Sequence, residues 1–454
     1  MRPQFAIGAA AAAAALLSVF VTRSLVQTPT VHSVDETVLR EYVGAYRWDT
    51  GAYLYLQRWN EFTGSNQLLA LDEYGDVRVL YAADTDRFFT GRSAAVPDPV
   101  ESRLEFQRSP AATVVSVTWQ RNGGAPRIAH RVDIERSEDV RFSNGNVQLS
   151  GTLISPRSSA RPPAMILVHG SGPASRDQVL PLARFVIRHG IAVLAYDKRG
   201  VGTSTGDWNT ASFDDLAGDV VAAYEYLKTR TDIDPKQIGV FGWSQAGWIM
   251  PLAAVRAKDM AFLISVSGAG VAAAETTIDQ AQNEMTARGM KPQTVADIVS
   301  IMKLQYAFAR TGQGWADYAA AREKLSARIG PPPDTLPGTT EHPYWQFIRR
   351  LYFHDPEPVL RQLQTPTLAL FGELDNNILA AKNQAAWERA LKAAGNRDYT
   401  LRILPKANHL QLEAKVGSSA EMASLQRFVP EYSATVLEWL SARIQGVRRD
   451  PSIQ

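Results

Sequence analysis

One serine stands at a turn that could make it a nucleophile. The segment Gly-Trp-Ser-Gln-Ala-Gly at 242–247 directly follows the apolar run 238–241. An apolar strand, a sharp Gly-x-Ser turn and a helix of small residues expose a serine hydroxyl at the edge of a sheet. Ala246 stands where the usual pattern has its second glycine, and Gly247 follows it to relieve the crowding. The pattern predicts that Ser244 attacks a carbonyl carbon.

A second serine matches the literal motif more closely. Gly-x-Ser-x-Gly occurs at 202–206 around Ser204. That serine lies well past the end of its expected strand, 191–196, in a polar loop that ends Gly-Asp-Trp-Asn. Ser244 instead ends a strand and has a helix behind it, so context favours Ser244. The alternative is that Ser244 is a structural serine at a tight turn.

A nucleophilic serine needs a base, and the base needs an acid that orients it. The expected strand 367–371 runs into Gly-Glu-Leu-Asp at 372–375. A carboxylate at the carboxyl end of a parallel strand points into the crevice where such sheets bind ligands. We expect Asp375 to be the acid. Glu373 is the local rival, and either carboxylate could instead cap a helix or brace a loop.

One histidine follows both the acid and the last expected strand. The chain has seven histidines, and His409 comes after the strand 399–404, in the order Ser, Asp, His that this type of site uses. His354 is a rival that is better explained as a lid or capping residue, and His342 is a weaker one. We expect His409 to be the general base.

The negative charge that develops on the attacked carbonyl needs hydrogen-bond donors. One is the backbone N–H of Gln245, the residue after the nucleophile. The second should come from the loop after an early strand, and His-Gly-Ser-Gly-Pro at 169–173 follows the apolar run 164–168. We assign this donor to Ser171, with Gly170 and Gly172 as competitors. His169 is then a structural residue of that loop.

Residues from about 140 onward resemble the bacterial α/β-hydrolases of the esterase and serine-aminopeptidase-like kind. The resemblance rests on Leu-Val-His-Gly-Ser-Gly-Pro at 167–173, Tyr-Asp-Lys-Arg-Gly-Val-Gly-Thr-Ser at 196–204, the Ser244 turn, 372–375 and Ala-Asn-His at 407–409. It implies an α/β fold with a doubly wound, mostly parallel sheet. It also implies that Asp197, Lys198 and Arg199 form a structural turn beside the site, although Arg199 could meet an anionic substrate.

The chain is too long for one core, and its 454 residues predict several units. Residues 36–143 show alternating apolar runs separated by turn signals, which predict a small antiparallel β-domain, similar to the lipocalin-like domains in front of some bacterial hydrolases. A hairpin near 142–154 opens the hydrolase core, of which 144–270 form the first part and 365–454 the second. Residues 271–364 show only helical periodicity and predict a cap.

The cap is expected to cover the site. Its aromatic residues would then line an acyl or aromatic pocket; they are Trp315, Tyr318, Tyr344, Trp345 and Phe347. The alternative is a peripheral helical subdomain.

The N-terminal segment 1–30 predicts a signal peptide or a membrane anchor. Arg2 precedes an uncharged, alanine-rich stretch at 5–21. We expect an exported protein, periplasmic or secreted, with an uncleaved anchor at 5–21 as the alternative. The chain has no cysteine, which excludes disulfides and lipoprotein anchoring.

Composition and motifs exclude several other classes of function. The 48 basic and 46 acidic residues nearly balance, so net charge does not indicate binding to nucleic acid. No metal motif such as His-Glu-x-x-His occurs, and the glycine-rich stretch at 268–273 lacks the following βαβ unit of a nicotinamide site. No cofactor or metal is therefore expected. The partner is a small-molecule ester or amide, with any membrane contact limited to the N-terminal segment.

Together these patterns predict a serine hydrolase that cleaves carboxylic esters through an acyl-enzyme, in the carboxylic ester hydrolase class. An ester is favoured over an amide because its barrier is lower and no acidic pair for a free α-amino group can be placed. Alternatives are a peptidase-like enzyme acting on small amides or peptides and a non-catalytic binding protein on a hydrolase fold.

Overall fold

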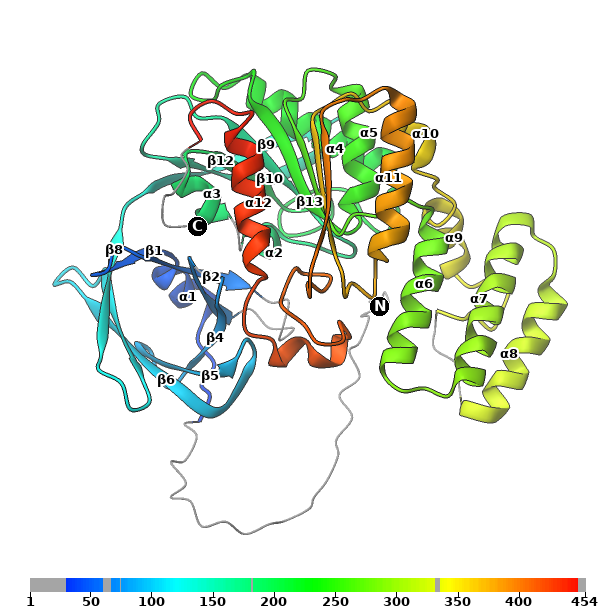
Figure 1. Cartoon of the computed structure of the whole chain (residues 1–454), viewed down its shortest axis with the longest axis horizontal. Helices are drawn as coiled ribbons and strands as arrows, with labels where there is room; N and C mark the ends of the chain where they lie inside the picture. Colours follow the sequence, from blue (N-terminus) through cyan, green and yellow to red (C-terminus); the bar gives the residue numbers. More distant parts are fainter. Residues whose placement is uncertain (1–29, 60–66, 74, 181–182, 331–334, 448–454) are drawn as a thin grey trace, which may run out of the picture.

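The computed structural model of the chain combines a closed eight-stranded barrel with a second, eight-stranded sheet that helices flank (Figure 1). It describes residues 30–59, 67–73, 75–180, 183–330 and 335–447. The expected signal peptide or anchor at 1–30 lies outside this part, apart from Thr30. None of the helices in the described ranges combines the length and the apolar character needed to cross a membrane.

The N-terminal barrel closes because its first strand pairs with both its second and its last strand. All neighbouring strands are antiparallel, which confirms the antiparallel β-domain. Helix α1 (Glu36–Tyr42) adds Leu39 and Tyr42 to the apolar interior. The strands are β1 (Gly44–Trp48), β2 (Tyr53–Trp59), β3 (Gln67–Asp72), β4 (Val77–Ala82), β5 (Arg87–Ser93), β6 (Val96–Arg108), β7 (Val114–Arg121) and β8 (Arg127–Val132).

Two barrel strands are apolar on both faces. In β3, Leu68 and Ala70 face the barrel interior, while Leu69 and Leu71 join the apolar cluster that continues into the second part of the molecule. β4 alternates in the same way, and all six of its residues are buried. Since side chains alternate across a strand, this pattern requires an apolar partner outside the barrel. That partner is the second sheet with its helices, so the barrel is docked on it.

The second sheet has the order β16-β15-β14-β13-β11-β12-β10-β9. Strands β11 to β16 run parallel, and β9 and β10 form the antiparallel edge. The expected hairpin is present, with Gly145 and Asn146 as its turn. Strand β9 begins at Glu135, inside the range expected for the N-terminal unit, yet it pairs with β10 in this sheet. The strands are β9 (Glu135–Asn144), β10 (Val147–Pro156), β11 (Ala164–Val168), β12 (Ala192–Tyr196), β13 (Ile238–Trp243), β14 (Leu263–Val266), β15 (Thr367–Gly372) and β16 (Tyr399–Leu404).

Helices cover both faces of this sheet, as expected for a doubly wound fold. α4, α5 and α11 bury one face, and α3 and α12 bury the other, the face to which the barrel is also docked (Figure 1). α4 begins with a capping box in which Ser212 and Asp215 bond each other's backbone N–H. The helices are α2 (Arg176–Val179), α3 (Ala183–Arg188), α4 (Phe213–Lys228), α5 (Ala246–Arg256), α10 (Glu357–Leu360), α11 (Ala380–Ala394) and α12 (Pro430–Ser441).

A helical insertion stands between β14 and β15, as the periodicity predicted. Its helices are α6 (Ala273–Ala287), α7 (Pro292–Thr311), α8 (Trp315–Ile329) and α9 (Tyr344–Leu351). The insertion has a core of its own, in which Tyr318 and Trp345 are 0% and 1% exposed. These two rings pack on each other and on Trp315 rather than lining a substrate pocket. Helical periodicity predicted the helices of this segment but not how their aromatic side chains pack.

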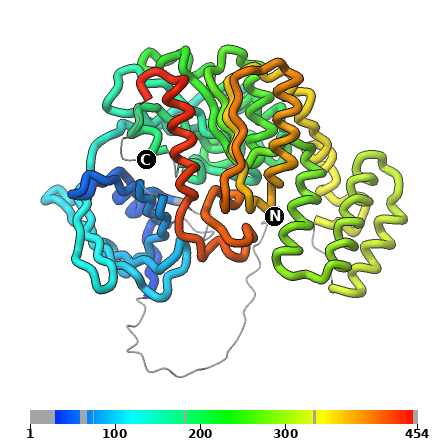
Figure 2. The backbone as a smooth tube through the Cα atoms, in the orientation of Figure 1, coloured from blue at the N-terminus to red at the C-terminus, as the bar shows by residue number. Residues whose placement is uncertain are grey.

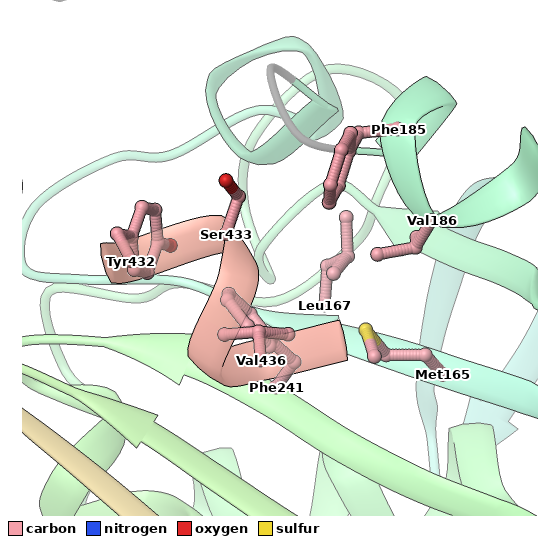
Figure 3. A pocket seen from close by; sticks show the side chains of 8 residues that line it. All are labelled: Met165, Leu167, Phe185, Val186, Phe241, Tyr432, Ser433 and Val436. Carbon is pink, nitrogen blue, oxygen red and sulfur yellow. The ribbon is translucent and has the colours of Figure 1, made fainter. Parts of the chain in front are cut away.

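A small apolar pocket lies between the second sheet and two helices of its barrel-side face (Figure 3). Met165 and Leu167 of β11 and Phe241 of β13 form its floor, and Phe185 of α3 and Val436 of α12 stand over it. None of the residues that line it belongs to the expected catalytic set, so this pocket is separate from the candidate site.

Candidate active site

Ser244 occupies a strained turn between β13 and α5. Its φ is 55°, a left-handed conformation that costs a non-glycine residue free energy. The turn is held from both sides: Ser244 N–H donates to Val266 O of the adjacent β14 at 3.1 Å, and Gly247 N–H donates to Ser244 O at 2.9 Å. The side chain is therefore presented at the carboxyl edge of the sheet, where a strand-to-helix turn exposes a nucleophile.

Close packing explains the small residues around this turn. A Cβ on Gly242 would lie 2.5 Å from the Cβ of Ala246 and 2.8 Å from Val168 O. A Cβ on Gly247 would lie 2.6 Å from Gly268 Cα. Ala246 is accommodated because Gly242 leaves the space that its methyl group fills. Glycine is thus required on each side of Ser244, although the literal second glycine of the motif is absent.

Asp375 and His409 are in direct contact. His409 Nδ1 lies 2.9 Å from Asp375 Oδ2 and 3.0 Å from Oδ1. Asp375 is only 2% exposed, and its Oδ1 also accepts the backbone N–H groups of Asn377 and Ile378. An ionised carboxylate only accepts hydrogen bonds, so Nδ1 of His409 carries the proton and Nε2 is the basic nitrogen. This is the tautomer that a general base requires.

Glu373, the rival acid, has a different partner. Its Oε2 accepts the backbone N–H of Lys406 at 2.8 Å, which ties the turn after β15 to the loop before His409. Gly372 lets that loop pass: a Cβ there would lie 2.5 Å from both Ala407 O and Asn408 O. Glu373 and Gly372 therefore set the position of the histidine loop, while Asp375 makes the contact with the imidazole.

A buried glutamine links the histidine loop to the strand beside Ser244. Gln411 Nε2 donates to Ser267 Oγ at 2.9 Å, and both side chains are 0% exposed. Ser267 directly follows Val266, the residue whose carbonyl accepts the N–H of Ser244. Gln411, two residues after His409, is thus connected to Ser244 through two hydrogen bonds and the peptide unit between Val266 and Ser267.

The loop after β11 lies against Ser244. A Cβ built on Gly170 would be 3.7 Å from Ser244 Cβ, so the 169–173 loop, with Ser171, borders the turn that carries Gln245. His169 does not act as a base here: its Nε2 lies 2.6 Å from Tyr196 O, and burial lowers its pKa to about 3. His354 packs edge-on against Phe213, and burial lowers its pKa as well. His169 is the structural loop residue that was expected.

The segment 410–429, which follows His409, passes between the barrel and the helical insertion (Figure 2). On the barrel side, Val77 N–H donates to Gln426 O at 2.9 Å and Phe428 N–H donates to Gly75 O at 3.0 Å. On the insertion side, Ser419 N–H donates to Glu284 of α6 at 3.2 Å. Since the histidine stands at the start of this segment, both accessory parts hold the loop that carries it.

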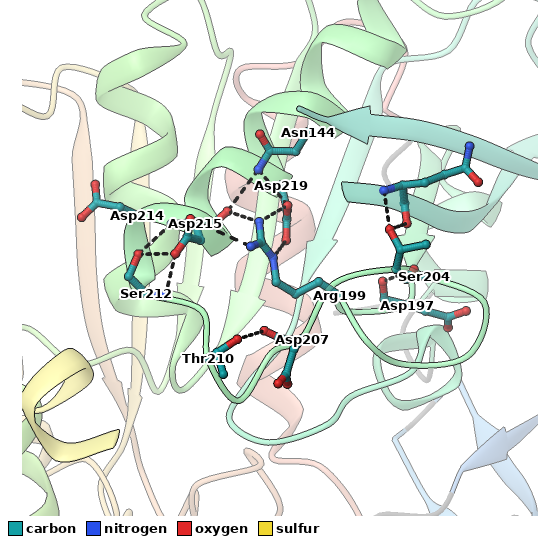
Figure 4. A network of polar contacts seen from close by, with 12 residues as sticks. Asn144, Asp197, Arg199, Ser204, Asp207, Thr210, Ser212, Asp214, Asp215 and Asp219 are labelled. Atoms are coloured by element: carbon teal, nitrogen blue, oxygen red, sulfur yellow. Dashed lines mark hydrogen bonds and ion pairs between the residues drawn. The ribbon is translucent and has the colours of Figure 1, made fainter. Parts of the chain in front are cut away.

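The second Gly-x-Ser-x-Gly serine has a structural place. Ser204 Oγ donates to Asp197 O at 2.8 Å and accepts the N–H of Ser150 at 3.0 Å, and the side chain is 7% exposed (Figure 4). Arg199 of the same turn forms a two-pronged ion pair with the buried Asp219 at 2.7 and 2.8 Å. Arg199 is itself 7% exposed, so this pair braces the turn rather than meeting a substrate.

Sequence reasoning missed two contributors to the site. No sequence pattern pointed to Gln411, because its hydrogen-bond partner Ser267 is 144 residues away in the chain. Lys198 was expected to be structural, yet its ammonium reaches both the 169–173 loop and Gln245. The available signal was a lysine two residues after a buried strand that pairs with β11, the strand before the predicted oxyanion loop.

Similar proteins are known by sequence and by structure. The esterase EstD of Thermotoga maritima is 23% identical over 275 residues, which are 59% of this chain and 59% of that protein. The quorum-quenching protein AidA of Acinetobacter baumannii is 27% identical over 128 residues, 28% of this chain and 42% of that protein. This chain therefore spans less than two thirds of either relative. A solved Pyrococcus furiosus esterase aligns with 68% of this chain and 91% of its own, at 19% identity and a TM-score of 0.43.

The family model covers the part of the chain that holds the site. A model described as the alpha/beta hydrolase family matches residues 165–417, more than half of the chain. This match runs from β11, through the Ser244 turn and the helical insertion, to the loop beyond His409. The chain belongs to the α/β hydrolase family.

Proposed function

We propose that the protein is a serine hydrolase that cleaves carboxylic esters with Ser244 as nucleophile, His409 as base and Asp375 as its orienting acid. The observation that carries the proposal is the 2.9 Å contact between His409 Nδ1 and the buried Asp375, at the same edge of the parallel sheet as the strained Ser244. A histidine held in this tautomer beside a serine at a strand-to-helix turn is suited to acyl transfer.

The reaction proceeds in two halves. Nε2 of His409 takes the hydroxyl proton as Ser244 Oγ bonds to the carbonyl carbon, and the tetrahedral oxyanion accepts hydrogen bonds from the N–H groups of Gln245 and Ser171. The imidazolium, stabilised by Asp375, then protonates the leaving alcohol, and an acyl-enzyme remains. A water molecule, deprotonated by His409, attacks the acyl carbon; collapse of the second oxyanion returns the proton to Ser244 Oγ and releases the acid.

An ester is favoured over an amide on chemical grounds and by similarity. An alkoxide is a better leaving group than the anion of an amine, and an ester carbonyl is less stabilised by resonance than an amide carbonyl, so an ester has the lower barrier. EstD of Thermotoga maritima and the Pyrococcus furiosus protein are both called esterases. The acidic residues Glu275 and Asp279 of α6 are paired with Lys382 and are not arranged to receive a free α-amino group. Cleavage of small amides or peptides is the alternative.

The first test is labelling with a fluorophosphonate, followed by peptide mapping and by turnover of p-nitrophenyl esters and aminoacyl p-nitroanilides. We expect an adduct on Ser244, and a loss of at least about 10⁴-fold in kcat for Ser244→Ala. Ser204→Ala is the matched control and should be labelled like the wild type. A folded wild-type protein without an adduct would contradict the proposal and favour a non-catalytic binding protein. Faster turnover of anilides than of esters would favour the peptidase-like alternative.

Export is a separate proposal that rests on the sequence alone. The alanine-rich stretch at 5–21 lies outside the described residues. Cell fractionation and N-terminal sequencing of the mature protein test it: a new N-terminus near residue 30 is expected for a cleaved signal peptide, and an intact N-terminus in the membrane fraction for an anchor. An intact N-terminus in the cytoplasmic fraction would contradict both.

A further inference from the structure

Lys198 is a buried lysine whose three polar contacts are all uncharged. Lys198 lies in the turn after β12, and the residue is 3% exposed. Nζ donates to Gly170 O at 2.6 Å, to Gly172 O at 3.0 Å and to Gln245 Oε1 at 3.1 Å. Burying an ammonium without a carboxylate in hydrogen-bond contact costs free energy, which these three hydrogen bonds offset.

The first contact controls the direction of a specific N–H group. Gly170 C=O and Ser171 N–H belong to one trans peptide unit, in which the two bonds point in opposite directions. A carbonyl held at 2.6 Å by the ammonium of Lys198 therefore directs the N–H of Ser171 away from the lysine. A flip of this peptide would break a charge-assisted hydrogen bond to a buried cation. The second contact, to Gly172 O, fixes the next turn of the same loop.

The third contact joins the other side of the site. Gln245 supplies the second proposed oxyanion donor through its backbone N–H, and its side-chain Oε1 accepts from Lys198. The residue is 8% exposed, so this amide is enclosed with the lysine. The Lys198 ammonium thus links the 169–173 loop to Gln245, the two segments that carry the proposed donors. Ser244 directly precedes Gln245 in the chain.

We propose that Lys198 is a positioning residue for the oxyanion: it holds the Gly170–Ser171 peptide and the Gln245 turn in the donor geometry and adds a fixed positive charge behind them. This inference rests on the proposed function and deepens it. Positive charge and pre-oriented donors favour the transition state because negative charge develops there and not in the ground state. Loss of Lys198 should therefore lower kcat more than it raises KM.

The surroundings of Lys198 make this role dependent on pH. Burial lowers the pKa of Lys198 from 10.5 to about 7, while Asp219 of α4 acts to raise it. Asp219 is already paired with Arg199, and the neighbouring His169 is neutral, with a pKa that Lys198 helps to lower. As the pH rises through about 7, Lys198 loses its proton in the folded protein. A neutral amine has two N–H groups for three acceptors and no charge, so activity should fall on the alkaline side.

The test uses full-length protein with a p-nitrophenyl ester from about pH 6 to about pH 9. Lys198→Met should lower kcat by about 10- to 100-fold at neutral pH, change KM by less than about 3-fold and remove the alkaline decline. Lys258→Met, at an exposed lysine, is the matched control and should follow the wild type. A Lys198→Met protein that keeps the wild-type kcat and the alkaline decline overturns the inference.

A second variant covers the case in which Lys198→Met does not fold. Gln245→Glu places a carboxylate at the atom that Nζ contacts, which stabilises the ammonium. The alkaline decline should then move upward by about 1 pH unit or more; an unchanged profile overturns the inference.

Ser244→Ala in the same assay separates this inference from the proposed function. A Ser244→Ala protein as active as the wild type would contradict both the proposed function and the Lys198 inference. An inactive Ser244→Ala protein beside fully active Lys198 and Gln245 variants with unchanged pH profiles would end only the Lys198 inference.

Discussion

Replacing Gly372 with alanine tests whether the loop before His409 determines catalysis. A Cβ at position 372 would lie 2.5 Å from both Ala407 O and Asn408 O, which are backbone atoms and cannot rotate away. His409 follows these two residues directly, so any shift that relieves the clash moves the imidazole. Asp375 is three residues from the substitution and is held separately by the N–H groups of Asn377 and Ile378.

The expected size of the effect follows from the required shift. The contact must open from 2.5 Å to the 3.4 Å of ordinary van der Waals contact, a movement of about 0.9 Å. A misplacement of about 1 Å in a catalytic group costs roughly 100-fold in rate, or about 2.7 kcal/mol of transition-state stabilisation. Crowding of a packed region also lowers the free energy of unfolding by about 1–3 kcal/mol. Gly372→Ala should therefore be folded, less stable and about 100-fold slower.

The assay is kcat for a p-nitrophenyl ester, measured beside circular dichroism and urea unfolding of the same sample. Gly124→Ala is the control, since a Cβ there would lie no closer than 3.4 Å to any neighbour. It should match the wild type in rate and in stability. A folded Gly372→Ala protein with kcat within about 3-fold of the wild type would refute the reasoning, because His409 would then keep its position although the loop had moved.

Two further predictions concern buried polar groups near the site. Ser204→Ala should leave kcat unchanged but lower the free energy of unfolding, measured by urea titration, by about 1–3 kcal/mol, because Ser150 N–H and Asp197 C=O lose their partner; a large loss of kcat would contradict this. His169 has a pKa of about 3 in the folded protein and 6.5 when unperturbed, so the unfolded chain binds the extra proton and stability should fall as pH drops below 6.5. His169→Gln should make this decline shallower in urea unfolding at about pH 4.5 and about pH 7, and an equal slope would contradict the assignment.

Short sequence patterns were sufficient to predict the elements that depend on neighbouring residues. The strand, turn and small-residue helix around Ser244 identified that turn although its motif is imperfect, and the literal motif at Ser204 proved to be a braced surface turn. The antiparallel barrel and the parallel sheet followed from alternation and from buried apolar runs. The resemblance to known hydrolases then predicted the order of the parts.

Long-range packing explains what the sequence did not predict. The role of Lys198 depends on carbonyl groups at 170, 172 and 245 that the fold alone brings together. The aromatic residues of the insertion were expected to line a substrate pocket, but Tyr318 and Trp345 are buried against each other in the insertion's own core. The outer faces of β3 and β4 pack against the second sheet and its helices, and the sequence alone did not predict this partner.

The contact between the barrel and the 410–429 segment has a consequence for the order of events during synthesis. Arg78 donates to Gln426 O across 348 residues, so this pairing cannot form until nearly the whole chain has been made. Domains that emerge first from the ribosome tend to fold first, which gives the barrel time to form before its late partner exists. The loop that carries His409 is thus completed on a surface made by the earliest part of the chain. We therefore expect hydrolytic activity to appear only once translation has reached the last helix, α12, and we expect a chain truncated before this helix to be inactive.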